Sequence, residues 1–316
     1  MTHFALLFPG QGSQSIGMLS DLSQQFSEVK TIFDRASVIL GYDLWELVQN
    51  DPAEQLHQTE FTQPALLAAD VAMFACWKKT ATTHPVVMAG HSLGEYAALV
   101  CADAMAFEDA IALVSLRGKY MQDAVAPGVG AMAAIVGLED AVVVAVCAEA
   151  SAIGVVSAAN YNSIGQIVIA GETTAVEKAI TLALEKGAKI AKKIPVSVPS
   201  HCALMQPAAD RLAEKLKTIT IHAPRIPVIQ NADVAAFQEP EKIRAALIQQ
   251  LIAPVRWVET IQAMMQQGVT HFYECGPGKV LCGLNKRISK EITCETLNTD
   301  PRSQIPDPRS QIPDNK

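Results

Sequence analysis

The stretch VVMAGHSLGEYAALV, residues 86–100, joins a short apolar run to an alanine- and leucine-rich segment through a glycine-bounded turn. The run up to Ala89 predicts a buried strand, and the segment that Ser92 opens predicts a helix. Gly90 and Gly94 permit the sharp strand-to-helix bend of a nucleophile elbow, which would project the Ser92 hydroxyl at a helix N-terminus. A serine that only caps a helix in a tight turn would give the same pattern, so that alternative stays open.

Strands and helices alternate on both sides of this turn, which predicts a mainly parallel sheet covered by helices. The strands expected in this sheet are residues 5–8, 86–89, 226–230 and 269–275. The expected helices lie between 18 and 79, after Ser92, and at 107–123, 203–217, 240–252, 256–267 and 279–289. The fold class we predict is therefore α/β, with a large domain similar to the α/β-hydrolases.

The middle of the chain has a different pattern. Strands are predicted at 131–137, 153–160, 166–171 and 188–196, and helices at 138–150 and 172–186. This β-α-β-β-α-β order is typical of a ferredoxin-like unit. We therefore expect a small ferredoxin-like domain at 126–197, inserted into a discontinuous large domain formed by 1–125 and 198–290.

The C-terminal segment, 291–316, contains the heptapeptide DPRSQIP twice in succession from Asp300. Its repeated prolines predict an extended, poorly packed tail without a chemical role.

The bulk properties argue against several classes of function. The net charge is −7 and no long basic run occurs, so nothing favours a nucleic-acid partner or a polybasic membrane contact. The seven cysteines form no Cys-x-x-Cys pair, which indicates reduced thiols in a cytoplasmic protein and no metal site. No segment reaches the roughly 18 to 20 apolar residues that cross a bilayer, so we expect neither an export signal nor an anchor.

A serine nucleophile needs a base, and His201 is the best-placed of the seven histidines. It lies in the proline-bounded loop IPVSVPSHCALM, where the chain returns to the large domain. His91 adjoins Ser92, but neighbouring side chains diverge at an elbow, so packing is its expected role. No carboxylate between Ser92 and His201 stands out as the group that orients the base; a backbone carbonyl would serve, and a structural loop histidine remains the alternative.

Arg117 lies on an apolar helical stripe, three residues after Val114 and four after Leu113. A buried guanidinium without an anion costs several kcal/mol or more, so this position predicts an internal carboxylate or a ligand that carries one. A structural ion pair and an arginine that reaches the helix end are the alternatives. The glycine-rich FPGQGSQSIG, residues 8–17, matches neither a Walker loop nor a Rossmann loop, but it can offer backbone N–H groups at the end of a strand.

Six separated motifs together resemble the malonyl-CoA:acyl carrier protein transacylase family of fatty-acid synthesis. They are FPGQGSQ at 8–14, GHSLGEYAAL at 90–99, RGKYMQ at 117–122, VSVPSHC at 196–202, PVRW at 254–257 and ECGPGKVL at 274–281. The resemblance covers residues 1–290. Cys275 stands where the family more often has valine, and the repeated tail is not part of the family pattern.

The resemblance implies a role for individual residues. Ser92 would be the acyl-accepting nucleophile, His201 its general base, and the main-chain carbonyl of Gln250 the group that orients the imidazole. The backbone N–H groups of Gln11 and Leu93 would form the oxyanion hole. Arg117 would bind the free carboxylate of malonate, and the small-domain segment that lines the cleft would contribute Asn160, Asn162 and Gln166.

The implied reaction is a ping-pong transfer of malonyl from malonyl-CoA to the phosphopantetheine thiol of acyl carrier protein, without metal or other cofactor. We expect a cytoplasmic monomer that meets the carrier protein through a local basic surface. The candidates for that surface are Lys189, Lys192, Lys193, Lys286 and Arg287. A serine hydrolase or thioesterase would share Ser92 and His201, and a non-catalytic acyl-CoA-binding protein is the third alternative.

Overall fold

The computed structural model describes residues 3–196 and 198–297 of the 316-residue chain. Its larger sheet has five strands in the order β7-β2-β1-β8-β9, and every neighbouring pair is parallel. These strands are β1 (Phe4–Phe8), β2 (Val87–Gly90), β7 (Val228–Ile229), β8 (His271–Glu274) and β9 (Thr293–Thr296). The predicted mainly parallel sheet is confirmed.

Helices cover both faces of this sheet, and successive side chains of a strand point to opposite faces, so one strand contributes to two cores. Phe4, Leu6 and Phe8 of β1 join one apolar core, whereas Ala5 and Leu7 join the other. The helices that pack on the first core are α2 (Ser27–Leu40), α3 (Leu44–Asn50), α4 (Thr59–Thr80), α5 (Gly94–Cys101), α6 (Phe107–Asp123), α9 (Gln206–Leu216) and α10 (Pro240–Gln249). The second core is covered by α11 (Trp257–Gln266) and α12 (Val280–Ile288). A short helix, α1 (Ser20–Gln25), precedes α2.

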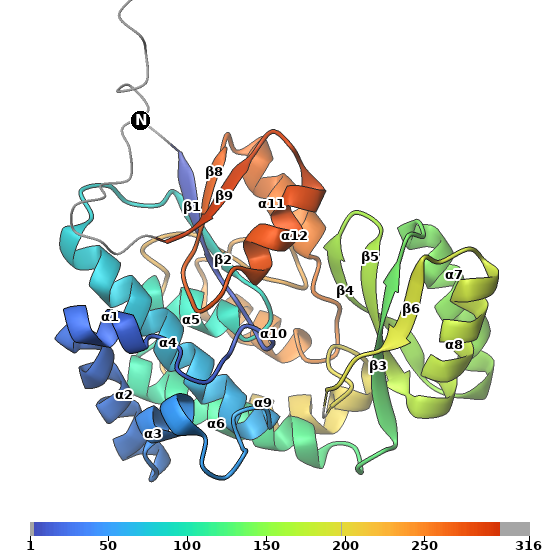
Figure 1. The fold of residues 1–316 in the computed structure, drawn as a ribbon, viewed down its shortest axis with the longest axis horizontal. Coiled ribbons are helices and arrows are strands. Elements are labelled where there is room, and N and C mark those ends of the chain that lie inside the picture. The colour runs from blue at the N-terminus through green and yellow to red at the C-terminus, as the bar shows by residue number, and fades with distance from the viewer. Residues whose placement is uncertain (1–2, 197, 298–316) are drawn as a thin grey trace, which may run out of the picture.

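The smaller sheet is antiparallel, in the order β4-β5-β3-β6. Its strands are β3 (Gly130–Val136), β4 (Val156–Ser163), β5 (Gln166–Glu172) and β6 (Ile190–Lys193). Helices α7 (Asp140–Ala150) and α8 (Thr173–Glu185) pack on one face of it. This arrangement confirms the predicted β-α-β-β-α-β unit, which lies beside the larger sheet in Figure 1.

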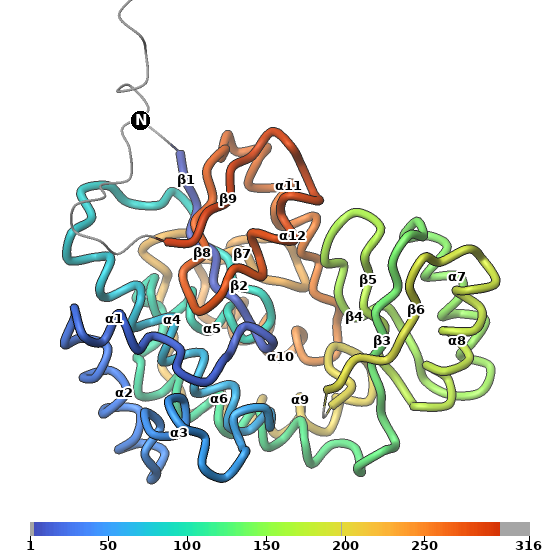
Figure 2. The backbone as a smooth tube through the Cα atoms, viewed as in Figure 1, coloured from blue at the N-terminus to red at the C-terminus, as the bar shows by residue number. Residues whose placement is uncertain are grey.

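The chain leaves the large sheet region after α6 and comes back before α9, as Figure 2 traces. Backbone hydrogen bonds also join the two sheet regions: Tyr161 N–H donates to the Val255 carbonyl, and Val255 N–H donates to the Ala159 carbonyl. The division into domains at residues 126 and 197 stays a prediction. No helix within 3–196 and 198–297 is long and apolar enough to span a membrane.

Several predicted boundaries were wrong. The strand expected at 153–160 is β4 at Val156–Ser163, because α7 continues into the 3₁₀ turn Ser151–Ile153. The expected strand 188–196 is confined to Ile190–Lys193, and a 3₁₀ turn at Ala203–Met205 precedes α9. Strand β9, near the start of the segment 291–316, was not predicted, and it pairs with β8 at the edge of the large sheet. The repeated heptapeptide lies outside the described residues.

Candidate active site

Ser92 occupies a sharp turn between β2 and α5. Its backbone is in the left-handed region, with φ at +53°, a conformation that non-glycine residues seldom adopt. The flanking glycines are required by close backbone approach. A Cβ on Gly90 would lie 1.8 Å from the Gly94 carbonyl carbon, and a Cβ on Gly94 would lie 2.0 Å from the Phe8 carbonyl oxygen. The predicted strand-turn-helix is therefore present, with β1 packed directly against the turn.

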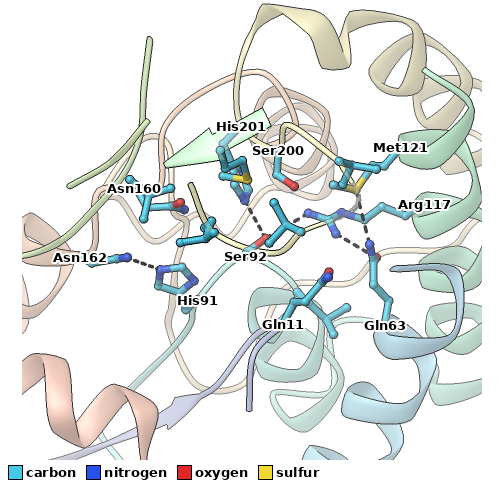
Figure 3. A pocket seen from close by; sticks show the side chains of 16 residues that line it. Gln11, Gln63, His91, Ser92, Arg117, Met121, Asn160, Asn162, Ser200 and His201 are labelled. Carbon is cyan, nitrogen blue, oxygen red and sulfur yellow. Dashed lines mark hydrogen bonds between the residues drawn. The ribbon is translucent and has the colours of Figure 1, made fainter. Parts of the chain in front are cut away.

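His201 is 3% exposed and faces Ser92 across the turn, as Figure 3 shows. Its Nε2 lies 2.8 Å from the Ser92 Oγ, and its Nδ1 lies 2.7 Å from the Gln250 main-chain oxygen. Because a carbonyl can only accept, Nδ1 carries the proton and Nε2 is left to accept from the serine hydroxyl. Burial, with a further contribution from the Arg117 charge, lowers the pKa of His201 to about 3, so the imidazole is neutral at physiological pH.

Arg117 is 1% exposed on α6 and points into the same space. Its Nη1 donates to Gln63 Oε1 at 2.8 Å, and its Nη2 donates to Gln250 Oε1 at 2.9 Å and to Ser92 Oγ at 3.3 Å. No carboxylate forms an ion pair with Arg117 anywhere in the described part of the chain. Burial lowers its pKa from the ordinary arginine value. Of the alternatives for this arginine, the structural ion pair is thus wrong.

These groups line a cavity of about 170 Å³ between the two sheet regions. The lining residues are Gln11, Gln63, His91, Ser92, Leu93, Arg117, Met121, Met132, Asn160, Asn162, Val168, Ile194, Val196, Val198, Ser200 and His201. Ser92, His201 and Arg117 thus meet in one small cavity (Figure 3).

Gln11 and Leu93 both line this cavity. Gln11 follows the end of β1, and Leu93 opens the turn into α5. Within 3–196 and 198–297, the backbone N–H groups of these two residues make no hydrogen bond, whereas the Ser92 N–H donates to Asn231 Oδ1 at 2.7 Å. Two free donors beside the Ser92 hydroxyl are what an oxyanion hole requires.

Two of the three predicted small-domain residues reach the cavity and one does not. Asn160 and Asn162 of β4 line it, and Asn162 Oδ1 lies 2.8 Å from His91 Nε2. Gln166, which was predicted to line the cleft, is the first residue of β5 and is not among the residues that line this cavity. Its Oε1 accepts from Ser163 Oγ at 3.2 Å and from Arg287 Nη1 at 2.7 Å, so the side chain is bound to α12 instead.

His91 contacts more than the sequence suggested. Its ring packs against the Trp257 ring with centroids 5.5 Å apart, as the packing interpretation requires, and it also lines the cavity beside Asn162. Burial lowers its pKa from the ordinary histidine value.

Sequence reasoning missed two polar residues, Gln63 and Asn231. Gln63 lies within α4 and binds Arg117. Asn231 follows β7 at the carboxyl edge of the parallel sheet, where such folds place ligand and catalytic groups, so the strand prediction carried a usable signal. Gln250 was predicted only for its main-chain oxygen, yet its side chain also binds Arg117 and donates from Nε2 to the Ser92 carbonyl at 3.0 Å.

The part of the chain that the structure describes contains no cluster of metal-binding side chains. No set of three or more histidine, cysteine, aspartate or glutamate side chains there could hold a metal ion. The expectation that the reaction needs no cofactor stays a prediction.

Comparisons with known proteins agree with this geometry. A family model described as the acyl transferase domain matches residues 5–297. The malonyl CoA-acyl carrier protein transacylase of Escherichia coli K12 is 54% identical over 298 residues, which cover 94% of this chain and 96% of that protein. The Bacillus subtilis protein of the same name is 44% identical over 92% of each chain.

Solved structures give the same result. The malonyl CoA-acyl carrier protein transacylase from Coxiella burnetii superimposes with a TM-score of 0.93 at 54% identity, covering 95% of both chains. A malonyl-transacylase solved in complex with a type II PKS acyl-carrier protein superimposes with a TM-score of 0.92 at 52% identity, over 94% of this chain and 96% of that one. This chain therefore belongs to the malonyl CoA-acyl carrier protein transacylase family.

Proposed function

We propose that this protein transfers a malonyl group from malonyl-CoA to the phosphopantetheine thiol of acyl carrier protein, through a malonyl ester on Ser92, and so supplies fatty-acid synthesis. The observation that carries the proposal is the buried Arg117. Among the described residues no carboxylate forms an ion pair with this cation, and its Nη2 lies 3.3 Å from the Oγ of a serine that is hydrogen-bonded to a neutral histidine. An acyl group with a free carboxylate satisfies that cation as it reaches the nucleophile.

In the first half-reaction, Ser92 Oγ attacks the thioester carbonyl carbon of malonyl-CoA while His201 Nε2 takes the hydroxyl proton. The Gln250 carbonyl accepts from Nδ1 and holds the imidazole in the tautomer that leaves Nε2 unprotonated. The negative charge that develops on the carbonyl oxygen is bound by the N–H groups of Gln11 and Leu93. The intermediate then collapses, the carbon–sulfur bond breaks, and CoA leaves with the proton from His201.

The second half-reaction uses the same groups in reverse. The phosphopantetheine thiol enters the cavity and gives its proton to His201, and its sulfur attacks the carbonyl carbon of the malonyl ester. The carbon–oxygen bond to Ser92 breaks, and Ser92 recovers its proton from His201. Since the serine, the histidine and the two backbone donors supply every proton and charge, this chemistry calls for no cofactor.

Selectivity for malonyl is proposed to come from the planar guanidinium of Arg117, which can form two charge-assisted hydrogen bonds to a carboxylate. Gln63 and Gln250 hold it from the sides through their neutral amide oxygens. An acetyl group brings no counter-charge and leaves the buried cation unpaired, so acetyl-CoA is disfavoured by a desolvation cost as well as by the missing bonds.

The carrier protein is the partner that the relatives' names specify, and one relative was solved with its carrier protein bound. We propose that docking uses the exposed basic side chains at 189, 192, 193, 286 and 287. Lys193 pairs with Glu177, and Arg287 donates to Gln166. No ion pair within the described residues engages Lys189, Lys192 or Lys286, which leaves these three to meet an acidic partner.

We also propose a cytoplasmic location and a monomeric state. All seven cysteines are buried free thiols, which supports a reducing compartment. Light scattering of the purified protein would test the monomer. Of the competing functions, hydrolysis is disfavoured because the relatives are named transacylases, and simple binding does not call for a serine hydrogen-bonded to a base.

The test is intact-mass spectrometry after incubation with malonyl-CoA, methylmalonyl-CoA or acetyl-CoA, followed by addition of the phosphopantetheine-loaded carrier protein. We expect one malonyl group on Ser92, its transfer to the carrier thiol, and no adduct in Ser92→Ala. Continuous CoA release without carrier protein would show a thioesterase instead. Turnover that survives Ser92→Ala would overturn the proposed mechanism.

A further inference from the structure

Two buried polar side chains lie behind the nucleophile and take no part in the proposed proton transfers. Asn231, in the loop after β7, and Glu95, in the first turn of α5, are both completely shielded from solvent. The amide of Asn231 spans the elbow. Its Oδ1 accepts from the Ser92 N–H at 2.7 Å, and its Nδ2 donates to the Gly90 carbonyl at 2.7 Å.

Glu95 fixes the position of that amide. Its Oε2 accepts from the Asn231 backbone N–H at 2.7 Å. This bond joins the loop after β7 to α5, the helix that follows the elbow. The Asn231 side chain is in turn bonded to Gly90 and Ser92 of the elbow. From these bonds we infer that Asn231 and Glu95 are positioning residues, which hold Ser92 in its left-handed conformation and so aim its hydroxyl at His201.

The inference rests on the proposed role of Ser92, and it has a chemical consequence. Because the Ser92 N–H donates to Asn231, that group cannot bind the oxyanion, and the task falls to the N–H groups of Gln11 and Leu93, which make no hydrogen bond among the described residues. A small rotation of the Ser92 backbone would move both the hydroxyl and the neighbouring Leu93 N–H. Misplacement by about 1 Å can cost about 10²-fold in rate.

Substrate binding should depend much less on Asn231. The side-chain hydrogen bonds of Arg117 run to Gln63, Gln250 and Ser92 and not to Asn231, whereas Glu95 interacts electrostatically with Arg117. Loss of the Asn231 amide should therefore lower kcat and leave the KM for malonyl-CoA nearly unchanged. A general loss of packing would not separate the two parameters in this way.

The two residues call for different substitutions. Asn231→Leu removes the donor and the acceptor at similar volume. For Glu95, burial raises the pKa to about 8, so the carboxyl is mostly protonated at neutral pH and glutamine is a close substitute. Glu95→Gln keeps an acceptor for the Asn231 N–H, whereas Glu95→Leu does not.

Asn285 provides a matched control, because it is an equally buried asparagine on α12 whose Oδ1 accepts from Trp257 Nε1 at 3.0 Å. Asn285→Leu should lower the melting temperature as Asn231→Leu does, yet leave the acylation rate of the folded enzyme unchanged.

The experiment measures the rate of Ser92 acylation by rapid quench and intact mass, with steady-state kcat and KM, at a temperature where every variant is folded. We expect Asn231→Leu to lose about 10- to 100-fold in acylation rate, with KM within about twofold of wild type. Glu95→Leu should lose less, and Glu95→Gln should stay close to wild type.

Wild-type rates in Asn231→Leu, or equal losses in Asn231→Leu and Asn285→Leu, would overturn the inference. The two Glu95 variants keep the test independent of whether Asn231→Leu folds. Equal acylation rates in Glu95→Leu and Glu95→Gln would contradict the role of Glu95 as an acceptor. If the wild-type enzyme itself shows no acylation of Ser92, the proposed function fails first, and the positioning role fails with it.

Discussion

The two walls of the cavity differ in the polarity of the side chains that line them. On the side of the large sheet, the polar residues Ser92, His201 and Arg117 are each held by hydrogen bonds from elsewhere in the chain, and His201 and Arg117 are buried whereas Ser92 is half-buried. On the side of the small sheet, the wall is mainly apolar: Met132 and Val168 belong to a compact cluster that contributes packing rather than charge. Figure 3 shows the polar groups converging on Ser92 from separate elements.

This difference follows from how the two kinds of interaction depend on geometry. Charge stabilisation requires donors and acceptors fixed before the reaction, so it belongs on a rigid parallel sheet and its helices. Apolar contact is nearly non-directional, and a wall built from it can set the size of the acyl group without aiming any atom. Substitutions on the two walls should therefore differ in size and in the kinetic parameter that they change.

The largest effect is expected for His201→Ala. Without the base, Ser92 keeps its proton, and the rate of malonyl-enzyme formation should fall on the order of 10³-fold. Rapid-quench mass spectrometry measures this rate, and circular dichroism checks that the variant is folded. A loss of less than tenfold would mean that another group deprotonates Ser92 and that His201 is not the general base.

Arg117→Ala should come next. Each charge-assisted hydrogen bond contributes about 1.5–3 kcal/mol, so loss of two should lower kcat/KM for malonyl-CoA by about 10²- to 10⁴-fold. The acetyl group has no carboxylate that could pair with the guanidinium, so transfer from acetyl-CoA should persist or increase. Competition between the two thioesters reports the ratio directly, with Arg117→Lys as the variant that keeps the charge. Equal losses of kcat/KM for malonyl-CoA and acetyl-CoA would show that Arg117 does not determine the selectivity for malonyl.

Local patterns were sufficient to predict the alternation of strands and helices, the elbow at Ser92 and the buried position of Arg117. A glycine-bounded turn and an apolar stripe are properties of neighbouring residues, so they can be read from one segment. His201 was harder to assign, because its loop gave a position but no partner. The partner is the Gln250 carbonyl, 49 residues away in sequence.

Features that arise only when distant segments meet were missed or misplaced. Gln63 and Asn231 reach the site through tertiary contacts 54 and 139 residues away in sequence. Strand β9 is four residues long and has one buried side chain, too little for a periodic signal. Gln166 was placed in the cleft by the family resemblance alone, and no local pattern in the sequence predicted that it starts β5 and accepts a hydrogen bond from Arg287 on α12.

A smaller effect links the Arg117 cation to the His201 imidazole on the polar wall. Burial is the main cause of the low pKa of His201, and the Arg117 charge lowers it further. Removal of that cation should therefore raise the pKa of His201, although burial still keeps it below the ordinary value near 6.5. With acetyl-CoA as substrate, the acid limb of the acylation rate should lie at higher pH in Arg117→Ala than in wild type. An unchanged limb would show that the two groups are not coupled.

The smallest effect is expected on the apolar wall, for Val168→Ala. Loss of two methyl groups widens the cavity without moving a polar atom, so kcat for malonyl-CoA should stay within about twofold of wild type, and methylmalonyl-CoA should gain about tenfold or less relative to malonyl-CoA. Val143→Ala, in the core of the small sheet and its helices, removes the same atoms away from the cavity and should change stability alone. A loss of malonyl transfer at Val168 as large as that of Arg117→Ala would reverse the comparison, because selectivity for malonyl would then depend on shape more than on charge.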